Sequence, residues 1–392
     1  MFNFGNHDDI TKIVNGVSIE ESDFKVAYKK WAIYYYESAI KAATYVINNS
    51  DINLIVDTNT LPTFYLFRHA IELLLKSILI KNKSKTECIS IFESNKHDLK
   101  ALFDVVSTIR MMPQEEYTWI SKYFDNINIF DQKSDLFRYP FPSTFLAQYK
   151  NKYLDILIIL NCLNSVFLLV HDFYCDDKLA SDSLQENIDY IYENSPDATF
   201  LCQASNGYGN CYLWQMYEMD SFKQIEGYKS IGDLLYREFT TSGDVMYIPP
   251  MIFMYRNLIE LLLKDIGISL HPNVISEIKR RYVVNITQDY LKSHELRRGL
   301  WSKYKFVFEY YANIEHWQTT EIHILEKYIK SIDKLDRNGD KFRYPTNKSL
   351  ELYHKGSLYD PNNMFYFFNE AAMFIEGMLM HIEATNEFLN EY

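Results

Sequence analysis

The sequence predicts an all-α protein built from two tandem helical units. One stretch occurs twice, at 62–81 and again at 250–269, with the run Ile-Glu-Leu-Leu-Leu-Lys in both copies. Residues that break helices are scarce, with 12 glycines and 10 prolines in 392 residues. A long self-match and few turns favour internal duplication and long helices. The 32 tyrosines and 26 phenylalanines are then expected to fill helix–helix interfaces.

The first repeat is expected to contain five helices. They cover about 23–48, 62–81, 97–109, 113–130 and 143–173. Asp23 is suited to cap the first of them, since its carboxylate can accept from the orphan N–H groups of a helix start. Pro62 follows a polar loop and is expected in the first helical turn, where its missing N–H costs nothing. Pro113 is expected to start the fourth helix.

Residues 176–220 are expected to connect the two repeats. The stretch is acidic and irregular at first, and it then carries Gly207 and Gly209. Short strands are predicted within 198–203 and 210–219. The chain therefore divides into domain 1 at 1–175, this connector, and domain 2 at 221–392.

The second repeat follows the same order of elements. A first helix is expected at 221–239, Pro250 takes the place of Pro62, and the repeated stretch follows. After a basic insertion the segments 293–301, 319–336 and 362–389 match later helices of the first repeat. The differences in spacing fall in the predicted loops, as expected for a diverged duplication.

The charge distribution limits the classes of partner. The net charge of −12 argues against a protein that lives on duplex DNA. One local group of cations stands out, at Lys279, Arg280, Arg281, Lys292, Arg297, Arg298, Lys303 and Lys305. A solvated helix face is the favoured interpretation of this group, and a binding patch is the alternative.

The cysteines indicate a reducing environment. Their number is five, and no Cys-x-x-Cys pair occurs, which suits free thiols in a cytosolic protein. His171 and Cys175 lie four residues apart and could share a helix face, but two such ligands make no metal site. No metal and no cofactor is therefore expected.

No membrane segment is expected. The N-terminus lacks the basic and apolar regions of a signal peptide. The most apolar run, 154–170, is barely long enough to span a bilayer and contains Asp155, Asn161 and Asn164. We interpret this run as a buried core helix and place the protein in the cytoplasm.

Polar residues recur on the two copies of the repeated stretch. Each copy carries an arginine, a glutamate and a lysine spaced by four, at Arg68, Glu72 and Lys76 and at Arg256, Glu260 and Lys264. Residues four apart share a helix face, so each copy forms a ladder of charges. The flanks are almost wholly apolar, so these charges are expected to be buried and to need partners. The other repeated polar residues, His97, His294, Arg138 and Arg343, are the expected partners.

Two interpretations of these residues remain open. In the first, the ladders brace helix packing, and the two histidines cap helices or bind backbone groups. In the second, Arg138 and Arg343 of the two Phe-Arg-Tyr-Pro corners bind phosphate through their planar guanidinium groups. We favour the structural role for the ladders, while the two corner arginines fit either role.

The repeated motifs resemble those of the HEPN superfamily. The first repeat contains Glu72-Leu-Leu-Leu-Lys76, then His97-Asp98-Leu99, then Arg138-Tyr139-Pro140. The second repeat contains Glu260-Leu-Leu-Leu-Lys264, then His294-Glu295-Leu296, then Arg343-Tyr344-Pro345. All three motifs occur in order in each copy. The resemblance covers about 23–173 and 221–390.

This resemblance implies two HEPN-like bundles packed as a pseudo-dimer. Many HEPN proteins are metal-independent ribonucleases of toxin–antitoxin, CRISPR and abortive-infection systems, with an Arg-x4–6-His site. The arginine would hold the scissile phosphate and the histidine would transfer a proton. Here no histidine follows Arg138 at that distance, and the first one after Arg343 is His354, eleven residues on.

The function expected from the resemblance is binding or cleavage of RNA in a bacterial antiviral defence or toxin–antitoxin system. The candidate catalytic residues are Arg138, Arg343, His97, His294 and His354. The alternative is a catalytically degenerate HEPN repeat that acts as a binding or scaffolding module for a partner protein or a nucleotide. Expected partners are accordingly RNA or an antitoxin-like protein, and a homodimer is compatible with the sequence.

Overall fold

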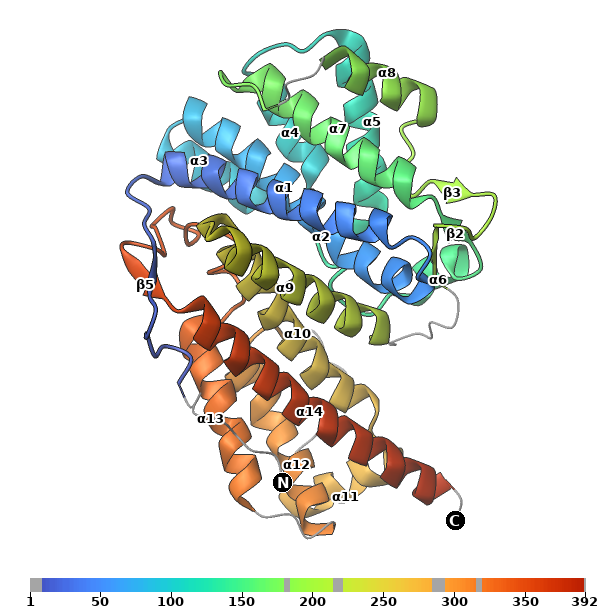
Figure 1. Ribbon diagram of the computed structural model, residues 1–392, viewed down its shortest axis with the longest axis vertical. Helices are drawn as coiled ribbons and strands as arrows, with labels where there is room; N and C mark the ends of the chain where they lie inside the picture. Colours follow the sequence, from blue (N-terminus) through green and yellow to red (C-terminus); the bar gives the residue numbers. More distant parts are fainter. Residues whose placement is uncertain (1–8, 180–183, 214–220, 284–292, 315–318, 391–392) are drawn as a thin grey trace. The chain divides into compact units, whose positions relative to one another are not determined.

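The structure is a computed structural model that describes residues 9–179, 184–213, 221–283, 293–314 and 319–390. About 70% of it is helical and the strands are two or three residues long, which confirms the all-α class (Figure 1). The helices before the connector are α1 Phe24–Asn48, α2 Asn53–Asn82, α3 Lys85–Asn95, α4 Leu99–Ser107, α5 Gln114–Asp131, α6 Ser143–Tyr149 and α7 Ile156–Tyr174.

The later helices begin inside the connector. They are α8 Leu184–Asn194, α9 Phe222–Ser242, η1 Val245–Tyr247, α10 Ile248–Ile268, α11 Pro272–Tyr282, η3 Leu296–Trp301, α12 Ser302–Ile314, α13 Thr319–Leu335 and α14 Pro361–Asn390. The strands are β1 Val17–Ile19, β2 Tyr153–Leu154, β3 Gln203–Ala204, β4 Cys211–Tyr212 and β5 Ser357–Tyr359. They form the antiparallel pair β1–β5 and a small sheet of order β3-β2-β4.

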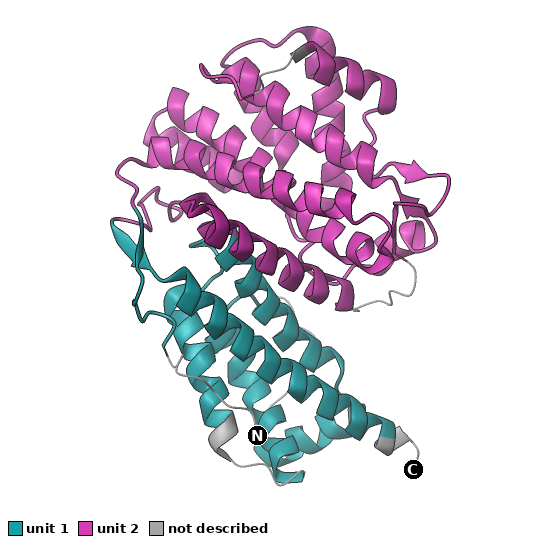
Figure 2. Ribbon diagram, in the orientation of Figure 1, with its two compact units in different colours: residues 1–19, 251–343, 356–392 teal, residues 20–250, 344–355 magenta. Residues whose placement is uncertain are grey.

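The chain forms two compact units (Figure 2). Unit 1 comprises Met1–Ile19, Met251–Arg343 and Gly356–Tyr392, and unit 2 comprises Glu20–Pro250 and Tyr344–Lys355. These units differ from the predicted ranges of 1–175, 176–220 and 221–392. The connector and α9 belong to unit 2 with most of the first repeat.

Helix α2 is the centre of unit 2. Every residue from Thr58 to Ile80 is buried. A helix that is apolar all round must be covered on all sides, and α1, α4, α7 and α9 pack against this one. The charged ladder at Arg68, Glu72 and Lys76 therefore lies inside the fold.

The prediction that Pro62 begins a helix is wrong. Helix α2 starts at Asn53, so the predicted loop at 49–61 is mostly helical and Pro62 lies inside the helix. Proline has no N–H to donate to the carbonyl of Thr58 one turn earlier. Helix α9 crosses at this point through Gly227, where a Cβ atom would lie 2.3 Å from the Thr58 carbonyl oxygen.

The predicted single helix at 143–173 is also interrupted. Helices α6 and α7 are separated by β2, which pairs with both β3 and β4. The carboxylate of Asp155 accepts from the Ile158 N–H at 3.1 Å and so starts α7 afresh. The connector therefore has short strands as predicted, although β3 begins where the first predicted strand ends. Residues 214–219 of the second lie outside the described residues.

Helices α3, α8, α11 and α12 have no counterpart among the predicted elements. Helix α3 begins with a capping box, in which the Ser84 hydroxyl and the Glu87 carboxylate each accept from the other's backbone N–H. Helix α11 lies in the basic insertion and begins at Pro272. The other predicted helices are present, and the Asp23 carboxylate caps α1 by accepting from the Lys25 N–H at 2.9 Å.

Helix α7 is the one described helix that is long and apolar enough to cross a membrane by length and composition alone. It packs against α2 and α8 within unit 2, and two-thirds of its most apolar window is buried there. This burial agrees with its interpretation as a core helix.

In unit 1 the beginning of the chain is fastened to the start of α14. The carboxylate of Asp360 accepts from the backbone N–H groups of Val14 and Asn15, and the Asn363 amide donates to the carbonyl oxygens of Asp9 and Lys12. Strand β1 then pairs with β5. These contacts assign the N-terminal segment to the unit that holds most of the second repeat.

Candidate functional site

The carboxylate of Glu72 is the centre of a buried polar cluster in unit 2. Its Oε1 atom lies 2.6 Å from Lys76 Nζ, 3.1 Å from His97 Nδ1 and 2.7 Å from the Tyr344 hydroxyl. Its Oε2 atom accepts from Arg68. The predicted ladder and the predicted histidine partner thus meet at one carboxylate, and the tyrosine of the second Arg-Tyr-Pro corner joins them.

Glu260 is the centre of a matching cluster in unit 1. Its Oε2 atom accepts from Arg256 at 2.8 Å, and its Oε1 atom lies 2.8 Å from both Lys264 Nζ and His294 Nδ1. Arg256 also donates to the carbonyl oxygen of His294 at 2.6 Å. The same residue types thus hold the same geometry in both units.

Both central glutamates are ionised. Burial by itself would raise the pKa of Glu72 and of Glu260, because a charge is costly in an apolar interior. Neighbouring cations outweigh that effect, with Lys76 the strongest in one unit and Lys264 in the other, and they hold the pKa of each carboxyl well below its usual range. The charge-assisted hydrogen bonds therefore persist at neutral pH.

Sequence reasoning missed an aspartate in each cluster. Arg68 Nε lies 3.2 Å from a carboxylate oxygen of Asp131 at the end of α5. The other oxygen of Asp131 accepts from the backbone N–H groups of Asp135 and Leu136 at 2.7 and 2.8 Å. This aspartate therefore ties the ladder to the corner that carries Arg138.

Asp336 takes the same place in unit 1. Arg256 Nε donates to its carbonyl oxygen at 3.3 Å, and its carboxylate accepts from the N–H groups of Asp340 and Lys341. Burial raises the pKa of both Asp131 and Asp336 despite the nearby arginines. The signal was present in the sequence, because the pattern Asp-x3-Asp-x-Phe-Arg-Tyr-Pro occurs in both repeats.

Tyr344 is the second group that sequence reasoning missed. Besides its hydrogen bond to Glu72, its ring lies 4.8 Å from Lys76 Nζ and meets the His69 ring edge-on at 5.1 Å. Tyr344 lies far from α2 in the sequence, and no local sequence pattern links this tyrosine to Glu72. Its contacts lie in unit 2, whereas the preceding Arg343 belongs to unit 1.

The predicted phosphate ligand Arg138 is enclosed, with only 4% of its surface exposed. It donates to the Tyr139 hydroxyl at 2.6 Å, and its guanidinium group lies over the rings of Tyr139 and Tyr65. Asp135 lies 3.6 Å away. In this arrangement the guanidinium group packs in the interior and orders the corner.

Arg343 is in a comparable position in unit 1, with 6% of its surface exposed. Its guanidinium carbon lies 5.8 Å from the centre of the Phe253 ring, and Asp340 is 3.9 Å away. Both corner arginines therefore lie in the interior, beside an aspartate three residues earlier in the chain.

His354 is fully buried in unit 2. Its ring lies 5.1 Å from the Trp31 ring, and its carbonyl oxygen accepts from the Glu21 N–H at 3.0 Å. The Tyr28 hydroxyl lies 3.2 Å from that of Thr346 in the same segment. These contacts fasten residues 344–355 against α1.

His97 and His294 are the candidate catalytic residues that keep a substantial exposed surface. Their side chains are 31% and 42% exposed, while Nδ1 of each ring is held by a buried glutamate. A carboxylate that holds one ring nitrogen fixes the orientation of the ring. The second ring nitrogen, Nε2, is the atom suited to carry a proton to or from a substrate.

The structure describes part of the predicted group of basic residues. Lys279, Arg280 and Arg281 are exposed at the end of α11, and Arg297 and Arg298 are exposed in η3. Glu277 pairs with Arg280 at 2.6 Å and lies 3.6 Å from Arg281. Lys292 lies outside the described residues. Arg297 and Arg298 follow His294 closely, so exposed positive charge is present in the segment of that histidine.

Comparison with known proteins found no match. No family model matches the chain, and neither the curated proteins nor the solved structures contain a match. The assignment of a function therefore depends on the geometry of the two clusters and on the motifs that carry the HEPN resemblance.

Proposed function

We propose that the protein is a HEPN-like ribonuclease of a bacterial defence or toxin–antitoxin system, with His97 and His294 as its proton-transferring groups. In this proposal the protein is cytoplasmic, and its two units form a HEPN-type pseudo-dimer. The observation that carries the proposal is the repeated pair of a buried glutamate and a partly exposed histidine, Glu72–His97 and Glu260–His294.

The chemistry follows from the pairs. RNA cleavage by attack of the 2′-hydroxyl needs a base for that hydroxyl and an acid for the leaving oxygen. An imidazole held at Nδ1 by an ionised carboxylate can serve as either, depending on its protonation. Exposed Arg297 and Arg298 supply positive charge for the phosphate in the segment of His294. The enclosed side chains of Arg138 and Arg343 favour a structural role for these two residues.

The test is cleavage of labelled single-stranded and structured RNA by the wild type, His97→Ala, His294→Ala and the double variant. We expect the double variant to lose cleavage by a factor on the order of 10²–10⁴, the usual contribution of general acid–base catalysis. His323→Ala is the matched control, since His323 is an exposed histidine on α13. Full cleavage by the double variant, or no cleavage by the wild type, would contradict the proposal.

A binding or scaffolding module is the second candidate function. It is favoured by the net charge of −12 and by the enclosed corner arginines, which do not present the usual phosphate ligand. Growth on expression separates the two functions, since a free ribonuclease slows growth and a scaffold does not. A scaffold would also bind a partner protein or a nucleotide without cleaving RNA.

A further inference from the structure

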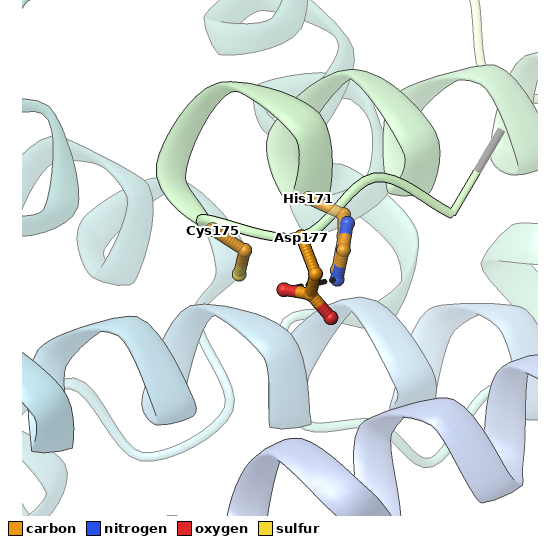
Figure 3. A group of neighbouring side chains, drawn as sticks. All are labelled: His171, Cys175 and Asp177. Carbon is orange, nitrogen blue, oxygen red and sulfur yellow. Dashed lines mark ion pairs between the residues drawn. The ribbon is translucent and has the colours of Figure 1, made fainter.

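Three potential metal ligands meet at the end of α7, within unit 2 (Figure 3). His171 and Cys175 lie one helical turn apart, and Asp177 follows in the segment after the helix. The nearest ligand atoms of the three side chains all lie within 4.8 Å of one another. His171 is buried, Cys175 is half-buried and Asp177 is exposed, so the group extends from the interior to the surface.

The imidazole of His171 is oriented for a ligand at Nε2. Its Nδ1 atom lies 3.2 Å from the carboxylate of Asp172, an acceptor, so Nδ1 carries the hydrogen and Nε2 carries the lone pair. A carboxylate behind a histidine is a common arrangement behind a metal ligand, where it fixes the tautomer.

The Nε2 atom of His171 lacks a hydrogen-bond partner among the described residues. It is fully buried, and no hydrogen-bond donor reaches it within the part of the chain that the structure describes. The Asp177 carboxylate lies close to it, with Oδ1 at 3.9 Å, and the same oxygen pairs with Lys29. Two acceptors that face each other across this distance are stabilised by a cation between them.

We propose that His171 Nε2, Cys175 Sγ and the Asp177 carboxylate bind a zinc ion, with Asp172 as the residue that orients His171. One nitrogen, one sulfur and one oxygen ligand suit Zn²⁺, whereas Mg²⁺ and Ca²⁺ prefer oxygen ligands alone. Cys175 binds as the thiolate, so its proton is released to solvent as the Zn–S bond forms. Three protein ligands leave a fourth position for water.

Lys29 is compatible with this site. Its ammonium group pairs with Asp177 from α1, and Lys81 pairs with the neighbouring Asp176 at 2.5 Å. The thiolate and the Asp177 carboxylate neutralise the two charges of zinc. The positive charge of Lys29 then balances the negative charge of Asp172. The ion would fasten the segment after α7 to the last turn of that helix.

The test uses the full-length protein and two metal probes. Zn²⁺ is titrated in competition with a chromophoric chelator, and Co²⁺ is added as a spectroscopic substitute. We expect about one tightly bound ion per chain and a sulfur-to-cobalt charge-transfer band, as for a tetrahedral site with one thiolate ligand. Absence of stoichiometric binding, or binding without the sulfur band, would overturn the proposal.

Variants locate the site. Cys175→Ser should abolish the sulfur band and weaken Zn²⁺ binding at least about tenfold, and Asp177→Asn should weaken binding by a similar factor. Asp177 is exposed, so we expect its replacement to leave the fold intact. The matched controls are Cys202→Ser, another half-buried thiol of unit 2, and Asp176→Asn. Equal losses in the control variants, or none in the site variants, would contradict the assignment.

Discussion

At the scale of single residues, the Tyr344 hydroxyl is one contact through which the second repeat reaches the polar cluster of the first. It donates to Glu72 at 2.7 Å, in a cluster that Lys76, Arg68 and His97 already supply with donors. An ionised carboxylate surrounded by donors in this way is strongly oriented. Each donor therefore contributes to the placement of His97 as well as to stability.

Replacing Tyr344 by phenylalanine tests this contact. The ring and its cation–π contact with Lys76 are kept, while the donor to a buried charge is lost. We expect the free energy of unfolding of unit 2 to fall by about 1.5–3 kcal/mol, as for a hydrogen bond to a charged group. Urea denaturation measures the change. Tyr208→Phe is the control, because Tyr208 is 85% exposed, and an equal change in both variants would exclude a special role for Tyr344.

The sequence revealed those residues of each cluster that lie close together in the chain and recur in both repeats. Spacing by four on one helix predicts that Arg68, Glu72 and Lys76 share a face, and repetition draws attention to His97. Tyr344 was not predicted as a ligand of Glu72, because the two are separated by most of the chain. No periodicity encodes such a contact.

At the scale of elements, the crossing of α2 and α9 depends on the absence of a side chain. Gly227 approaches the carbonyl of Thr58, which Pro62 leaves without its helical donor, and a Cβ atom there would also lie 3.0 Å from Pro62 Cδ. The Asn59 amide donates to the Ser230 hydroxyl at 2.9 Å beside the crossing. Proline and glycine thus act together in bringing two helix backbones close.

Gly227→Ala tests this crossing. Alanine favours an isolated helix by about 1 kcal/mol over glycine, so a change without the close contact would stabilise the protein. We expect destabilisation of about 1–3 kcal/mol instead, because the added methyl group meets rigid backbone atoms. The thermal unfolding midpoint measures this change in stability. The control is Thr240→Ala, at an exposed position of α9. An increase in the midpoint would contradict the proposed packing.

Helix boundaries were predictable where a cap marked them. Asp23 and Pro113 mark the starts of α1 and α5, and both starts agree with the sequence. The start of α2 was misplaced because a proline inside a buried helix imitates a first turn. The break between α6 and α7 was missed because β2 forms only by pairing with strands some fifty residues later.

At the scale of the whole molecule, each compact unit contains a buried glutamate with its own set of cations, Glu72 in unit 2 and Glu260 in unit 1. In both cases the folded-state pKa lies below the usual value of 4.5. A lowered pKa means that the ionised carboxylate stabilises the fold above that value, and that this contribution is lost as the pH falls through the folded-state pKa. Asp131 and Asp336 act in the opposite direction, since their pKa is raised.

The variants Glu72→Gln and Glu260→Gln test this dependence unit by unit. At about pH 7 each should lower stability by about 3–5 kcal/mol, because the buried cations lose their counter-charge. The difference from the wild type should narrow as the pH falls below 4.5, because the unfolded wild-type chain takes up a proton there, and it should vanish once the folded glutamate is protonated at its lowered pKa. Urea midpoints across this range measure it. Glu93→Gln, at an exposed position, is the control, and a difference independent of pH would contradict the assignment.

The place where the chain changes unit between Arg343 and Tyr344 has a practical consequence. A fragment that ends in the connector would contain Glu72, Tyr28 and Trp31 but lack the segment 344–355 that contacts them. The repeated stretch of sequence thus does not coincide with a compact unit. Separate expression of the two repeats would divide the compact units, so we expect fragments that follow the units and keep this short segment to be the better choice.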